Sequence, residues 1–247
     1  NCTVLTEINY NATNVNGLSI ENNVFSNAGQ DGEGITVNIG ANVTKLPNSI
    51  FSPSYNNYSY APNIAIVNFA EGSVCASIGE SAFENCKSLK SIVLPEALTN
   101  IRTYAFFNCK SLTSITIPNG VASIGDGAFQ SCDTLASITI PESVTSIGSG
   151  AFSSCYALAE VYNYSSLTIT AGSSSNGALG QYAKVVYNAS DLSGGKPETR
   201  ITVVDNVQYY NYGDDFVALA PAVARETLTE VTLDNLSLIH ISEPTRH

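Results

Sequence analysis

Cysteine is the residue type in this sequence with the widest choice of chemistry, because a thiolate can bind a metal, attack a substrate or form a disulfide. The sequence holds six cysteines. Five share one position of a repeating pattern, four of them at intervals of 23 residues: Cys2, Cys86, Cys109, Cys132 and Cys155, with Cys75 off this register. Four zinc ligands must converge on one point, and an evenly spaced row does not converge. We therefore expect no metal site.

Catalysis by a cysteine or serine would need a nearby base, and histidine is the commonest one. The two histidines, His240 and His247, both lie in residues 236–247, which read LSLIHISEPTRH. This string resembles the codon-by-codon translation of a sequencing adapter, so we interpret it as read-through and exclude it from the fold. The remaining sequence has no histidine and no Ser-x-x-Lys motif in a suitable setting. It predicts a protein that is not an enzyme and has no cofactor.

Acidic residues outnumber basic ones by 21 to 10 and give a formal net charge of −11. Nucleic acids and anionic membranes both require a basic surface, so neither is an expected partner. No apolar run is long enough to span a bilayer, which predicts no membrane insertion. The acidic pairs Asp31/Glu33 and Asp214/Asp215 fit no EF-hand loop, and we interpret them as solvated turn residues.

An internal repeat dominates the middle of the chain. Isoleucine, phenylalanine and leucine series keep the same 23-residue step as the cysteines. Their members are Ile78, Ile101, Ile124 and Ile147; Phe83, Phe106, Phe129 and Phe152; and Leu89, Leu112, Leu135 and Leu158. One unit cannot bury its own apolar face, whereas stacked units cover one another. The spacing therefore predicts a solenoid.

A single repeat, residues 124–146, contains two kinds of spacing. Residues 137–140 alternate polar and apolar side chains, as a short strand does, and Pro141 ends that strand because proline cannot donate to a ladder. The apolar positions before it suit a tight helical or 3₁₀ turn. These positions are Ala128, Phe129, Cys132 and Leu135.

The full pattern, C-x2-L-x2-I-x-I-P-x2-V-x2-I-G-x2-A-F, resembles the BspA-like leucine-rich repeats of secreted and surface proteins. The resemblance covers residues 78–161, with Arg102 where other units have Gly, and it breaks at Tyr164, where they have Pro. It implies a leucine-rich-repeat solenoid with one short parallel β-strand per repeat and short helical or 3₁₀ turns on the convex side. The strand-like stretches 183–187 and 201–210 add a small β-rich module. The resemblance also implies that the cysteine row points inward, so we expect buried free thiols rather than disulfides.

We expect six segments along the chain, which we interpret as a fragment that extends in both directions. Residues 1–10 end a truncated upstream repeat, 11–36 form an irregular Asn- and Gly-rich connection, and 37–163 form the repeat array, with clean repeats from residue 78. Residues 164–223 form a cap and small β module, 224–235 start a further repeat, and 236–247 are the adapter read-through.

If the strand isoleucines and leucines face inward, their neighbours face outward and form a flat face rich in hydroxyls. The candidate contact residues on this face are Ser91, Val93, Ser114, Thr116, Ser137, Thr139, Glu160 and Tyr162. A Tyr-rich insertion adds Tyr55, Tyr58 and Tyr60, since tyrosine is favoured at interfaces. The expected partner is a protein or a glycan, because such a face offers no deep pocket for a small molecule.

The leading hypothesis is a non-catalytic binding or adhesion surface of a secreted or cell-surface protein, as the resemblance implies. The alternative is a structural spacer, or an accessory module of a larger secreted enzyme. The repeat pattern is compatible with each of these functions and does not decide between them.

Overall fold

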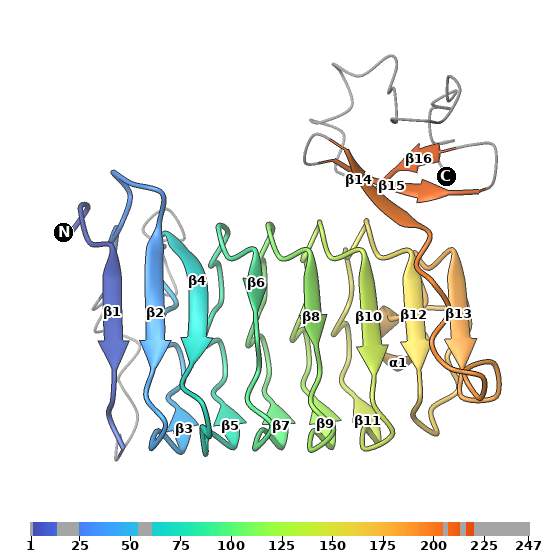
Figure 1. The fold of residues 1–247 in the computed structure, drawn as a ribbon, viewed down its shortest axis with the longest axis horizontal. Helices are drawn as coiled ribbons and strands as arrows, with labels where there is room; N and C mark the ends of the chain where they lie inside the picture. The colour runs from blue at the N-terminus through green and yellow to red at the C-terminus, as the bar shows by residue number, and fades with distance from the viewer. Residues whose placement is uncertain (1, 14–24, 54–60, 205–206, 213–215, 220–247) are drawn as a thin grey trace.

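The computed structural model describes residues 2–13, 25–53, 61–204, 207–212 and 216–219. Its main feature is a stack of parallel strands that runs along the molecule (Figure 1). The strands are β1 (Glu7–Tyr10), β2 (Ile35–Ile39), β4 (Ile64–Phe69), β6 (Ser91–Ile92), β8 (Ser114–Thr116), β10 (Ser137–Ile140), β12 (Glu160–Asn163) and β13 (Val185–Asn188). A parallel bridge between Val93 and Thr116 joins the two four-stranded halves. The expected solenoid is confirmed, and we call this stack the long sheet.

A second parallel ladder runs beside the long sheet, so each clean repeat contributes two strands where one was expected. Its members are β3 (Lys45–Leu46), β5 (Ser77–Ile78), β7 (Asn100–Ile101), β9 (Ser123–Ile124) and β11 (Ser146–Ile147). These strands stay short because a sharp corner follows each of them. At Gly125 a Cβ atom would lie 2.5 Å from the backbone nitrogen of Thr103, so a side chain at this corner would collide with the neighbouring turn.

The segment between the two ladders is a series of short hydrogen-bonded turns, as the spacing predicted, and it contains no continuous helix. The Cys109 N–H donates to the Phe106 carbonyl at 3.3 Å, as a 3₁₀ turn requires. The Phe106 N–H, however, donates to Ala128 in the next repeat at 2.8 Å. Positive φ values interrupt each segment, for example 55° at Tyr104 and 59° at Asn108. A right-handed helix cannot continue through such residues.

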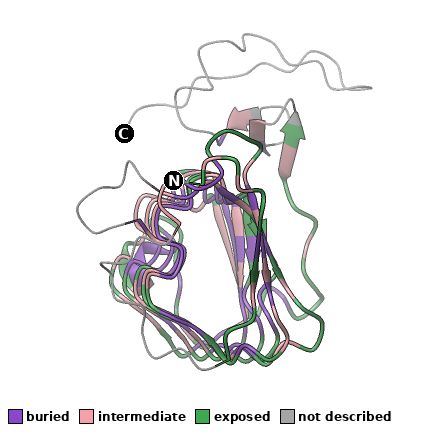
Figure 2. Cartoon of the chain, turned by 90° about the vertical axis from the view of Figure 1, so that its left-hand side faces the viewer, coloured by how far each residue is buried: buried purple, intermediate pink, exposed green. Residues whose placement is uncertain are grey.

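Identical side chains stack through the interior of the solenoid, whose successive turns overlap in Figure 2 when viewed along the axis. Phe51, Phe83, Phe106, Phe129 and Phe152 form one column, with ring centres 5.3 to 5.4 Å apart. Each ring is at most 1% exposed. Burying a phenylalanine contributes roughly 1.5–3 kcal/mol relative to leaving it in water, so this column and its isoleucine and leucine neighbours hold the repeats together.

The C-terminal part departs from the solenoid pattern. A short helical segment, α1 (Ser175–Ala178), has positive φ at Asn176 and Gly177 and is therefore irregular. It is followed by β13 and then by an antiparallel sheet of β14 (Ile201–Val204), β15 (Val207–Asn211) and β16 (Phe216–Ala218). This sheet is the small β-rich module that the sequence predicted. No helix in the described part of the chain is long and apolar enough to cross a membrane.

Candidate contact surface

The outer face of the long sheet holds most of the residues that we expected to contact a partner. Its strands pair in register, so that Ser137 stands beside Ser114 and Thr139 beside Thr116. The side chains that project from the outer face in β6, β8 and β10 are exposed or half-buried: Ser91, Val93, Ser114, Thr116, Ser137 and Thr139. Small hydroxyl side chains leave this part of the face flat and open.

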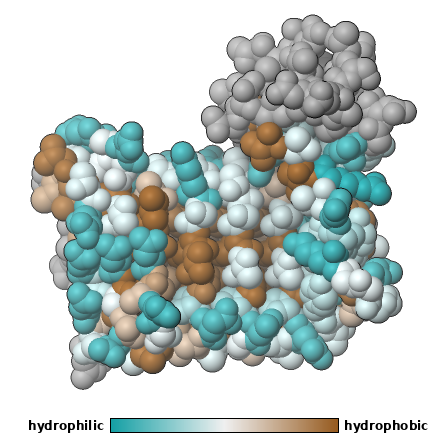
Figure 3. All heavy atoms as spheres, viewed as in Figure 1, coloured by the Kyte–Doolittle hydropathy of each residue, from teal (hydrophilic) through white to brown (hydrophobic). Residues whose placement is uncertain are grey.

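An apolar patch lies in the middle of the outer face, between hydrophilic areas (Figure 3). Val93 is 80% exposed and Ile66, on the neighbouring strand, is 48% exposed. The sequence analysis did not name Ile66, because it assigned outward strand positions only from Ser91 onward. The register between β2 and β4 shifts after Ile35, so that Thr36 pairs with Ile66 and Ala65 is the extra residue of a bulge. A bulge reverses the direction of the side chains that follow it.

A row of asparagines continues the outer face toward β1, and the sequence analysis did not identify it. The Asn38 side-chain amide donates to Asn9 at 3.0 Å and to Glu7 at 2.9 Å, and the Asn68 amide donates to Asn38 at 3.1 Å. An amide both donates and accepts, so each member of such a row can bind the next. The strand positions of Asn9, Asn38 and Asn68 could have revealed the row, had the register of β1, β2 and β4 been known.

The prediction that Glu160 and Tyr162 are exposed is wrong. Their register partners in β10 show that both project outward, but a later segment covers them and both are 0% exposed. The Glu160 carboxylate accepts hydrogen bonds from the Tyr162 hydroxyl at 2.8 Å, the Thr199 hydroxyl at 2.7 Å and the Arg200 backbone N–H at 2.7 Å. The Lys196 ammonium lies 4.0 Å from the centre of the Tyr162 ring. We call residues 196–200 the strap.

The burial of Glu160 and Tyr162 beneath the strap affects the pKa of the tyrosine and places its ring in contact with a neighbouring strand. Loss of solvent, and then the hydrogen bond with Glu160, raise the pKa of the Tyr162 hydroxyl. The Tyr162 ring also stacks on Tyr187, with ring centres 5.3 Å apart. Beyond the strap, Tyr210 and Leu219 of the C-terminal module pack against three alanines of the solenoid: Ala136, Ala157 and Ala159. The module is therefore attached to the solenoid by polar and apolar contacts together.

A groove lies at the carboxyl ends of β8 and β10, on the same side of the molecule as the outer face. Its volume is about 890 Å³. It is lined by Thr116, Ile117, Asn119, Thr139, Pro141, Glu142, Ser143, Tyr164 and Ala189. Tyr164 stands where the earlier repeats have Pro118 and Pro141, so the departure noted in the sequence forms one wall of the groove. We call this feature the Glu142 groove.

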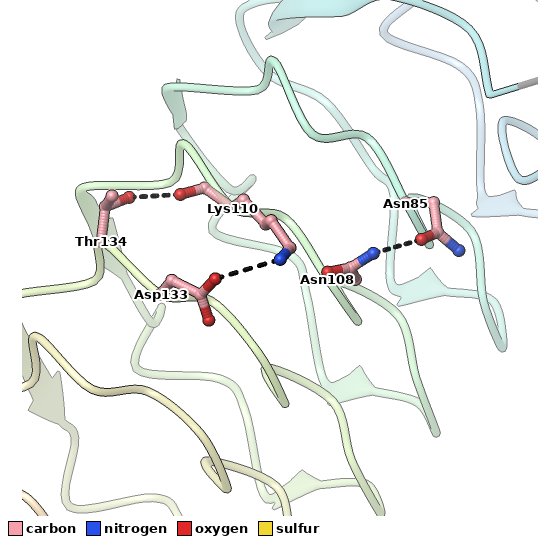
Figure 4. Close-up of polar contacts among 5 residues, drawn as sticks. All are labelled: Asn85, Asn108, Lys110, Asp133 and Thr134. Carbon is pink, nitrogen blue, oxygen red and sulfur yellow. Dashed lines mark hydrogen bonds and ion pairs between the residues drawn. The ribbon is translucent and has the colours of Figure 1, made fainter. Parts of the chain in front are cut away.

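The Tyr-rich insertion cannot be placed on this surface, since Tyr55, Tyr58 and Tyr60 lie outside the described residues. The polar contacts on the turn side of the repeats, shown in Figure 4, link one turn to the next. Lys110 pairs with Asp133 at 3.3 Å, and the Asn108 amide donates to Asn85. They are repeated contacts between neighbouring turns and do not converge on a common point.

Four members of the cysteine row, Cys86, Cys109, Cys132 and Cys155, are buried free thiols, as the sequence predicted, whereas the fifth member, Cys2, is exposed. The Cys109, Cys132 and Cys155 thiols donate to the carbonyls of residues 83, 106 and 129 at 3.1 to 3.2 Å. Burial raises the pKa of the Cys155 thiol to about 12. Within the described ranges, no group of three or more His, Cys, Asp or Glu side chains could hold a metal ion. With raised pKa values, these thiols are protonated at neutral pH.

Residues 54–175 match the family profile described as BspA type Leucine rich repeat region, in 6 copies. Among solved structures, a leucine-rich repeat protein of T. pallidum is 28% identical, with a TM-score of 0.49 over 64% of this chain and 71% of that one. A leucine rich cell surface protein from Faecalibacterium prausnitzii A2-165 is 23% identical, with a TM-score of 0.41 over 87% of this chain. The present chain covers 49% of that second protein. No curated protein sequence matches the chain.

Proposed function

Because residues 54–175 consist of BspA-type leucine-rich repeats, we propose that this chain is a non-catalytic adhesion surface of a secreted or cell-surface protein. Repeats of this type are typical of bacterial surface proteins with a protein-binding role. The chain would contact a protein or a glycan on a host or microbial surface. The outer face of the long sheet, from β2 to β10, is the part of the molecule that we assign to this contact.

The observation that carries the proposal is the apolar patch on an otherwise polar, open sheet face. Val93 is 80% exposed at the centre of this face, and Ile66 lies diagonally across from it. An apolar centre surrounded by hydrogen-bonding groups is the usual anatomy of a protein interface. The asparagine row on one side and the serines and threonines on the other supply these polar groups.

An extended flat face also suits a macromolecule better than a small substrate. Small ligands require a concave site with converging polar groups, whereas solenoids present long surfaces made of repeated positions. Each repeat would contribute a modest amount to affinity, and the contributions would add along the array. The thiols of Cys86, Cys109, Cys132 and Cys155 are buried and are not part of this face.

The test is a binding screen of the whole chain against immobilised matrix proteins and glycans. Any ligand found is then measured with the double variant Ile66→Asp and Val93→Asp, which places two charges in the apolar patch. We expect affinity to fall about tenfold or more, which corresponds to about 1.4 kcal/mol. Val4→Asp is the matched control, because Val4 is 78% exposed but lies before β1, outside the sheet.

Retention of binding by the Val4→Asp protein and loss by the double variant would support the proposed face. Equal binding by all three proteins would show that the contact lies elsewhere. A whole chain that binds nothing in the screen would favour the alternative function, a structural spacer or an accessory module of a larger secreted enzyme.

A further inference from the structure

We infer that the Glu142 groove takes a linear peptide segment of a partner protein, and that this segment carries lysine or arginine. This inference rests on the proposed function and names the chemistry of part of the partner. Two observations support it. One is the set of residue types that line the groove, and the other is the set of contacts that hold the strap against the neighbouring strand.

The strap shows how this face holds a peptide. Residues 196–200 form neither helix nor strand and run in front of β12 on their way to β14 (Figure 1). A carboxylate, Glu160, accepts a hydroxyl and a backbone N–H from the strap, at 2.7 Å each. A tyrosine ring, Tyr162, receives the Lys196 ammonium at 4.0 Å. The recognition elements are therefore one carboxylate and one aromatic ring, and the bound segment supplies a cation.

The Glu142 groove presents the same two side-chain types one turn away. Glu142 is the one charged residue in its lining, and Tyr164 supplies an aromatic wall. Tyr164 is two residues beyond Tyr162, at the carboxyl end of β12, and its N–H donates to the Ile140 carbonyl at 2.9 Å, which fixes its backbone. The groove thus has the same two side-chain types as the strap site, here from two successive turns, and among the described residues no side chain forms an ion pair with Glu142.

Size and charge both favour a basic peptide as the occupant. A volume of about 890 Å³ is open to solvent along the face and has room for several residues of a chain. The hydroxyls of Thr116 and Thr139 and the amide of Asn119 can bind peptide groups along its length. A chain with a formal net charge of −11 attracts cations and repels acidic segments. Hydrogen bonds between a cation and a carboxylate are stronger than neutral ones.

The experiment is selection from a random peptide library displayed on phage, with the whole chain immobilised. We expect the selected pool to be enriched in lysine and arginine relative to the input library. A peptide synthesised from this pool should bind Glu142→Gln about tenfold more weakly than the unchanged protein, in line with loss of a charged hydrogen bond. Tyr164→Leu should also weaken binding, through loss of the ring face that receives the cation.

Glu96→Gln is the matched control. Glu96 follows Pro95 as Glu142 follows Pro141, but it lies two repeats earlier and outside the groove. Binding by this variant should equal that of the unchanged protein. An equal loss in both variants would indicate a general charge effect and would overturn the assignment of the groove.

Two further results would also overturn the inference. One is a selected pool without enrichment in lysine and arginine. The other is a glycan from the binding screen whose affinity depends on Glu142, which would make the groove a saccharide site. In either case the proposed function stands if the double variant of Ile66 and Val93 still lowers affinity for a partner about tenfold or more. The proposed function fails separately, if the screen yields no partner of the outer face.

Discussion

At the scale of single residues, position in the repeat decides what a side chain can do. The cysteine thiol is reactive in water, yet four thiols in this chain are enclosed between stacked turns, where burial raises the pKa of each: Cys86, Cys109, Cys132 and Cys155. Cys75 is also buried, with a raised pKa, whereas Cys2 is exposed. The same residue type is thus a core residue at five positions and a surface group at one.

This difference predicts the outcome of thiol titration. In the folded protein we expect one thiol, Cys2, to react quickly with a water-soluble disulfide reagent, and the other five to react only after denaturation. Rapid reaction of more than one thiol in the folded state would contradict the buried row. Mass spectrometry of the labelled peptides identifies which cysteine has reacted.

The raised pKa values also set the pH dependence of stability. A thiol whose folded pKa lies above its unfolded value, about 8.5, contributes stability that is complete below that value. The contribution is lost as the pH rises toward the folded pKa, which is about 12 for Cys155. Stability to urea should therefore fall between about pH 8.5 and 11, and a chain with Cys155→Ala should show a smaller fall.

Residue-scale reasoning from the sequence was right about which strand residues point outward, because alternation along a strand is a property of the backbone. It was wrong about the exposure of Glu160 and Tyr162, because alternation does not reveal which later segment covers a face. Two bulky residues in a row of serines and threonines were the available signal. A residue that departs from the repeat pattern in this way indicates that its side chain contacts a segment outside the array of repeats.

At the scale of structural elements, the strap and the C-terminal module depend on Glu160. Its carboxylate receives three hydrogen bonds, two of them from the strap. Hydrogen bonds to a charged group contribute roughly 1.5–3 kcal/mol each. Removal of this one side chain should therefore detach the strap without unfolding the solenoid.

We predict that Glu160→Ala makes trypsin cleave after Arg200 about tenfold faster, because local opening becomes easier; Lys196 precedes Pro197, and trypsin does not cleave that bond. Ser137→Ala is the control, since Ser137 occupies the same row one turn earlier, whereas the strap donates its hydrogen bonds to Glu160. Timed digestion followed by mass spectrometry measures both rates. An unchanged rate in Glu160→Ala would mean that the apolar contacts of Tyr210 and Leu219 hold the module without the carboxylate.

The elements themselves were predicted in part. The strand at residues 137–140 follows from alternation and from the proline behind it, and the structure has it as β10. The second ladder was missed because strands such as Ser123–Ile124 are too short to show a period. The left-handed residues inside the turns were not predicted, because they include Tyr104 and Ser131, side chains that seldom adopt a positive φ.

At the scale of the whole molecule, each turn contacts its neighbours and little else, as in other solenoids. The step of 23 residues was visible in the sequence and fixed the parallel stacking of the central turns. The position of the C-terminal module could not be predicted from the sequence. The module packs on Ala136, Ala157 and Ala159, and small residues of this kind are common throughout the repeats, so nothing marks these three as a contact site.

The repeat predicts the effect of removing one turn. Deletion of residues 101–123 joins Asn100 to Ile124 and recreates the corner that Ser123 and Ile124 form. We expect this protein to fold with the same circular dichroism spectrum and a lower Tm, because one interface between turns is lost. Deletion of residues 101–112 removes about half a period and should prevent folding of the array. Folding of both proteins, or of neither, would contradict the account of interchangeable turns.

The central claim is that the outer face of the long sheet binds the partner, and side-chain footprinting tests it most directly. Hydroxyl radicals oxidise exposed side chains, and the rates are compared for the free chain and for its complex with a ligand from the screen. The account predicts that Val93 and Ile66 become protected in the complex while Val4 keeps its rate. Unchanged oxidation of Val93 and Ile66, together with protection of Tyr104 and Tyr156 on the turn side, would contradict it.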